Sequence, residues 1–146
     1  MTVFRLAAAL AALCVSGPAS ADPDALWPLL EEIRIVETEA DGVWRADKTF
    51  PDALEALRGP VVVTGYPVVV LSEAEHSLFM LVRDREDCPF CGSGNGYGPS
   101  IEVELAQPTR VLEPGVRHVV TGALELVRDT DTYQAYRLVD ARVAPE

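Results

Sequence analysis

The sequence predicts a mostly β protein, in which a small five-stranded barrel follows a short helical and extended region. From Pro60 onward, apolar residues occur in the short runs that are typical of strands. Residues 61–71 and 117–128 are too long to remain straight strands in a small domain, and both contain the motif VVTG, which places a glycine where each can bend. Two long bent strands among five antiparallel ones describe the Greek-key barrel called the OB-fold. An open sandwich of five or six strands is the alternative.

The lead-in, residues 22–59, is expected to hold two short helices and a hairpin. Its expected elements are a helix over 24–32 capped by Asp24, strands at 33–38 and 43–45 around the turn Asp41-Gly42, and a helix over 49–59 capped by Thr49 and ended by Gly59. The barrel is expected to occupy residues 60–146, with strands at 61–71, 77–82, 101–105, 117–128 and 133–143.

The amino-terminal 21 residues have the pattern of a secretory signal peptide. A short positively charged start is followed by an apolar run at 6–15 and by the small residues Ala19-Ser20-Ala21. We therefore expect cleavage after Ala21 and a periplasmic protein. The apolar run is shorter than the roughly 20 residues that cross a bilayer, and no later segment is a better candidate for crossing one, so no membrane-spanning segment is expected.

Charge and composition narrow the class of partner. The chain has 23 acidic residues against 12 lysines and arginines, which gives a formal net charge of −11. Such a surface repels nucleic acid, a frequent ligand of OB barrels, so we expect no nucleic-acid partner. An apolar fraction of 49% indicates a folded core rather than a disordered acidic chain. The partner is expected to be a protein or a small molecule.

Cys88-Pro89-Phe90-Cys91 carries the clearest chemistry in the chain. Two thiols at this spacing can close a disulfide, exchange electrons or bind a soft metal ion. In an oxidising compartment, a disulfide is the simplest reading. The tetrapeptide resembles the active site of thioredoxin-like oxidoreductases, but the residues that follow cannot continue the helix that activates the first cysteine there.

Metal binding requires more ligands than two thiolates. Zinc takes four ligands in a tetrahedron, and the further candidates are His76 and His118. The loop glycines Gly92, Gly94, Gly96 and Gly98 suggest a phosphate-binding loop, yet they lead into a strand rather than a helix, so we reject that function. No residue is assigned a catalytic role. A binding or accessory module with a zinc site is expected, and a thiol-disulfide protein or a structural disulfide domain is the alternative.

Several segments together resemble a group of secreted bacterial proteins of unknown function that have an OB-like domain. The resemblance is carried by Phe50-Pro51 with Leu54, by Leu57-Arg58-Gly59, by residues 61–69 around Gly65-Tyr66, and by the return at residues 99–103. It implies an OB-like fold and export. Members of that group carry a cysteine and a nearby histidine in a proline-rich loop, whereas this chain has Cys88 and Cys91 in a glycine-rich one.

Overall fold

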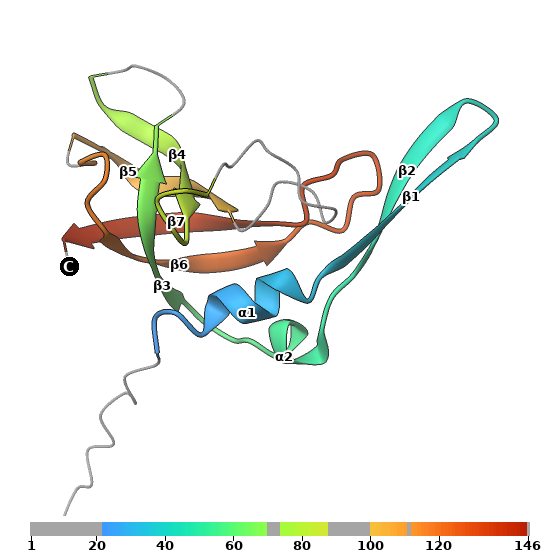
Figure 1. The fold of residues 1–146 in the computed structure, drawn as a ribbon, viewed down its shortest axis with the longest axis horizontal. Helices are drawn as coiled ribbons and strands as arrows, with labels where there is room; N and C mark the ends of the chain where they lie inside the picture. Colours follow the sequence, from blue (N-terminus) through green and yellow to red (C-terminus); the bar gives the residue numbers. More distant parts are fainter. Residues whose placement is uncertain (1–21, 70–73, 88–99, 111, 146) are drawn as a thin grey trace, which may run out of the picture.

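The structure is a computed structural model that describes residues 22–69, 74–87, 100–110 and 112–145 (Figure 1). Its elements are α1 (Leu26–Glu31), β1 (Arg34–Ala40), β2 (Val43–Thr49), α2 (Asp52–Glu55), β3 (Val61–Val68), β4 (His76–Val82), β5 (Ser100–Thr109), β6 (His118–Leu126) and β7 (Tyr136–Pro145). The predicted mostly β fold is confirmed. No described helix has both the length and the apolar character to cross a bilayer.

Strands β3 to β7 form a closed barrel in the order β3-β4-β5-β7-β6, and β6 pairs back with β3. Four of the five contacts are antiparallel, while β5 and β7 run parallel. The architecture is consistent with a small OB-like barrel. The expectation that all strands are antiparallel is wrong at one pair, because five strands in a closed ring cannot alternate in direction at every contact. Strand β7 lies antiparallel to β6 and is therefore parallel to β5.

Both predicted glycine bends occupy special positions in the barrel. Strand β3 pairs with β6 up to Gly65 and with β4 from Tyr66 onward. A Cβ atom on Gly65 would lie 2.5 Å from the carbonyl oxygen of Val82, so the strands approach too closely there for any side chain. At Gly122 the β6–β7 pairing shifts register, and a Cβ atom would lie 2.9 Å from the carbonyl oxygen of Val139. The bends therefore let one sheet close on itself.

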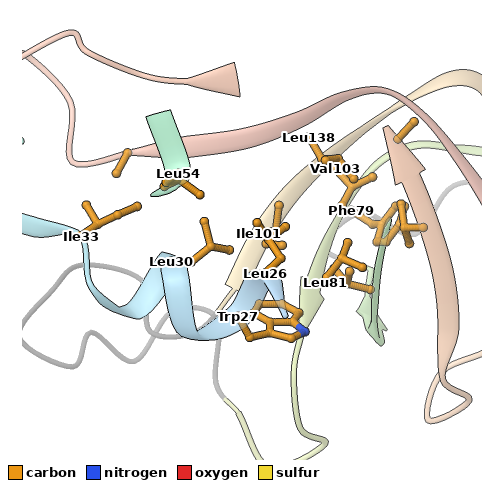
Figure 2. Close-up of a cluster of buried hydrophobic side chains, with 14 of the residues drawn as sticks. Leu26, Trp27, Leu30, Ile33, Leu54, Phe79, Leu81, Ile101, Val103 and Leu138 are labelled. Atoms are coloured by element: carbon orange, nitrogen blue, oxygen red, sulfur yellow. The ribbon is translucent and has the colours of Figure 1, made fainter. Parts of the chain in front are cut away.

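The core fills the barrel and continues beneath α1. Its inward side chains include Val63, Phe79, Leu81, Ile101, Val103, Val120 and Leu138, all at most 1% exposed. Figure 2 shows Leu26, Trp27 and Leu30 of α1 in the same cluster. The indole Nε1 of Trp27 donates a hydrogen bond of 2.9 Å to the carbonyl oxygen of Thr64, which fastens α1 to β3.

Both helices are shorter than the sequence predicts. Helix α1 begins at Leu26 after the cap residue Ala25, and Asp24 makes no capping bond because its carboxylate bonds other elements. Helix α2 spans only Asp52–Glu55, and Thr49 ends strand β2 instead of capping the helix. In both cases a tertiary or strand contact competes with local capping.

Strands β1 and β2 form a separate two-stranded sheet, longer than expected, that projects beside the barrel (Figure 1). The predicted turn is confirmed, with φ of 54° at Asp41 and 76° at Gly42, the left-handed values that a two-residue hairpin turn requires. The hairpin is attached to the β6–β7 connection. The amide of Ala46 donates to the carbonyl oxygen of Thr130 at 2.8 Å, and the rings of Trp44 and Tyr133 lie 5.4 Å apart.

Candidate functional site

Of the residues predicted to carry function, only the two histidines lie within the described part of the chain. Cys88, Cys91 and the loop glycines Gly92, Gly94, Gly96 and Gly98 lie outside it. His76 begins β4, is partly exposed and pairs with Thr109. His118 begins β6, is 2% exposed and pairs with Gly65.

The strand pairing keeps the two histidines apart. His118 pairs with Gly65, and the next residue of β3, Tyr66, pairs with Val82 at the far end of β4 from His76. His76 and Val82 are the two ends of β4, six residue steps apart, which is a length of about 20 Å. One metal ion therefore cannot bind both side chains. Among the described residues, no group of three histidine, cysteine, aspartate or glutamate side chains is arranged to hold a metal ion.

His118 is the exceptional polar residue of the barrel interior. Its side chain lies on the inward face of β6, on which Val120 and Gly122 follow as buried residues. Both ring nitrogens, Nδ1 and Nε2, are buried and have no hydrogen-bond partner among the described residues. A buried polar group without a partner typically costs about 1–3 kcal/mol. In native proteins such a group calls for a structural or functional explanation.

An ion pair next to His118 joins three elements at this end of the barrel. Arg117, the preceding residue, places Nη2 2.5 Å from Oδ1 of Asp24. The hydroxyl of Thr64 in β3 donates to the same carboxylate. The hydrogen bond from Arg117, and then that from Thr64, hold the pKa of Asp24 below its ordinary value. The segment before α1, strand β3 and the segment that leads into β6 are thus linked beside the buried imidazole.

The chain leaving β4 forms a tight turn at the same end of the barrel. The amide of Asp84 donates to Oδ2 of Asp87 at 2.9 Å, and the amide of Asp87 donates back to the carbonyl oxygen of Asp84 at 3.1 Å. Arg83 bonds Asp84 and also forms an ion pair with Glu31 at the end of α1. This turn ends one residue before Cys88 in the sequence.

Arg85 connects that turn to the segment that leads into β6. Its Nη2 donates a hydrogen bond of 2.5 Å to the carbonyl oxygen of Gly115, three residues before His118. Its guanidinium also lies over the ring of Tyr66, 5.2 Å from the ring centre. The residues that precede Cys88 and those that precede His118 are therefore tied together.

The two arginines were not identified from the sequence. Arg85 and Arg117 have no motif around them, and each bonds a residue at least 30 positions away. In the sequence, His118 is a candidate only because histidine is a metal ligand, and its burial depends on the pairing of β6 with β3. Comparison of the chain with protein-family models, with curated proteins and with solved structures gives no match.

Proposed function

We propose that this protein is an exported binding module, acting in the periplasm, with a zinc site formed by Cys88, Cys91 and His118. The observation that carries the proposal is the imidazole of His118, which is buried and, within the part of the chain that the structure describes, has no hydrogen-bond partner at either nitrogen. A neutral imidazole always has one nitrogen lone pair available, and metal coordination would use it. Thiolate sulfur and imidazole nitrogen are the ligands that tetrahedral zinc prefers.

The position of His118 in the barrel supports this combination over one with His76. The turn at residues 83–87 leads directly to Cys88, and Arg85 ties that turn to the segment before His118. His76 begins the same strand whose far end leads into this turn, about 20 Å away along β4. Three protein ligands would leave a fourth position of the tetrahedron for water or for a group of the partner.

The experiment is metal and thiol analysis of the mature protein, prepared from the periplasm without reductant or chelator. We expect one zinc ion per chain and two thiols that become alkylatable after denaturation. Replacement of zinc by Co²⁺ should give the intense absorption of a tetrahedral thiolate complex, with a band intensity that reports the number of sulfur ligands. Protein without metal and without free thiols would contradict the proposal and indicate a Cys88–Cys91 disulfide.

The two histidines provide a matched pair of variants. His118→Gln should weaken zinc binding by about 100-fold or more, above the 10–100-fold typical of losing an outer-shell partner. His76→Gln should bind zinc like the parent. Because His118 lies in the core, the circular dichroism of each variant is compared with that of the parent. Equal zinc affinity in two folded variants would exclude His118 as a ligand.

A further inference from the structure

The outer edge of β1 has a hydrogen-bonding pattern that follows from its turn. In a two-residue hairpin the residues flanking the turn, here Ala40 and Val43, form a hydrogen-bonded pair, and such pairs alternate along the ladder. The backbone groups of Ile35, Glu37 and Glu39 therefore point away from β2. The same rule turns the amide of Ala46 away from β1, and this amide does bond outward, to the carbonyl oxygen of Thr130.

Among the described residues, no strand lies beside this edge. There β1 pairs with β2 alone, and no backbone hydrogen bond engages Ile35, Glu37 or Glu39 on the outer side. The strand is seven residues long and contains neither proline nor lysine, two residues that commonly protect an edge, and its charged residues are Arg34, Glu37 and Glu39. Val36 is 59% exposed on the face turned from the barrel, which is high for a large apolar side chain.

The hairpin is held rigidly enough to serve as a template for another strand. Nε1 of Trp44 donates a hydrogen bond of 2.9 Å to Oε2 of Glu37, and the Trp44 ring packs on Tyr133. Lys48 bonds the carbonyl oxygen of Asp129 at the base. A binding strand would therefore meet an ordered partner, which lowers the entropic cost of association.

We propose that the outer edge of β1 binds an extended segment of another protein as a third strand, with lysine or arginine residues opposite Glu37 and Glu39. Strand addition to a free edge is a common mode of peptide recognition. The charge of the edge favours a basic partner, because Glu37 and Glu39 lie along it in a chain with a net charge of −11. The register that pairs all three outward residues of two copies would place Glu37 against Glu37, and like charges directly opposite are destabilising.

The test uses the peptide acetyl-Lys-Val-Lys-Val-Lys-amide and amide hydrogen exchange of the mature protein measured by NMR. Bound peptide should slow exchange at Ile35, Glu37 and Glu39 by at least about tenfold, because their amides become paired. The amides of Val36 and Thr38 already bond β2 and should change little. The matched peptide with glutamate in place of lysine should have no effect. No change at 1 mM basic peptide, or uniform slowing along β1, would overturn the proposal.

Two variants at Glu39 distinguish the contribution of backbone hydrogen bonding to peptide binding from that of the side-chain charge. Glu39→Pro removes an outward donor without removing a β1–β2 bond, and Glu39→Lys reverses the charge. Each should weaken peptide binding by about tenfold or more, a change of about 1.4 kcal/mol. Glu86→Lys makes the same charge change on the exposed turn after β4 and should bind like the parent. Dimers in sedimentation without peptide, lost in Glu39→Pro, would assign the edge to a second copy and overturn the proposed partner.

Discussion

Replacement of Gly65 by valine tests whether the barrel closes as described. A Cβ atom at this position would lie 2.5 Å from the carbonyl oxygen of Val82 and 2.8 Å from Cγ of Leu81. Because the nearer atom belongs to the backbone of the paired strand, β4 must move by about 1 Å to restore an ordinary contact. Overpacking of this kind costs about 3 kcal/mol, the upper part of its usual range, since the two valine methyl groups add further contacts.

The assay is thermal and urea unfolding of residues 22–146. At about 4 °C per kcal/mol for a domain of this size, we expect Gly65→Val to lower the Tm by about 12 °C. Ala123→Val is the matched control, because it places valine on an exposed strand position and should change stability by less than about 0.5 kcal/mol. Equal Tm values for the two variants would refute the close approach of β3 and β4 at Gly65.

Three further variants test single contacts. Trp27→Phe removes the hydrogen-bond donor to the buried carbonyl oxygen of Thr64 and should lower the free energy of unfolding, measured in urea, by about 1–3 kcal/mol. An unchanged free energy of unfolding would mean that this oxygen finds another donor. Because its pKa is lowered, Asp24 stabilises the protein at pH values above the unfolded pKa of about 3.9, and this contribution is lost as the pH falls through the folded pKa. In Asp24→Asn, the urea midpoint should therefore depend less on pH between pH 6 and pH 2.5 than it does in the parent. A pH profile parallel to the parent's would contradict the role of Arg117. Burial, and then the charge of Glu31, raises the pKa of Tyr136 to about 12, so its contribution to stability is complete below about pH 10 and is lost as the pH rises toward 12. Tyr136→Phe should abolish that part of the alkaline destabilisation, and ultraviolet titration should show one fewer late-titrating tyrosine in the variant than in the parent.

The barrel could be predicted because its main constraints are local in sequence. The VVTG repeat marked Gly65 and Gly122, and the structure shows a change of strand partner at the first and a register shift at the second. The hairpin turn at Asp41-Gly42 could be predicted equally well, because few residue types readily adopt the left-handed backbone angles that the turn requires. The helix caps were predicted wrongly, since Asp24 bonds Arg117 and Thr64 across the fold rather than its own helix.

For the candidate site, the sequence could predict which residue types bind metal but not which of these residues lie close together. Histidine and cysteine are metal ligands wherever they occur, so His76 and His118 were equal candidates in the sequence. Strand pairing separates them: His118 faces the interior beside Gly65, while His76 begins β4 on a partly exposed position. The edge of β1 was not recognised from the sequence at all, because an unpaired edge is a property of the neighbouring strands.

The sequence by itself determined the strand periodicity, the two bends and the hairpin turn, because each depends on backbone sterics and on the alternation of side chains within a few residues. Only the tertiary structure decided that β5 and β7 are parallel. For the residues that the structure describes, it also decided that the imidazole of His118 is buried without a hydrogen-bond partner and that Ile35, Glu37 and Glu39 form an unpaired edge. These properties depend on which distant strands become neighbours and in what register. A shift of one residue in the β3–β6 pairing would turn His118 to the outside of the barrel.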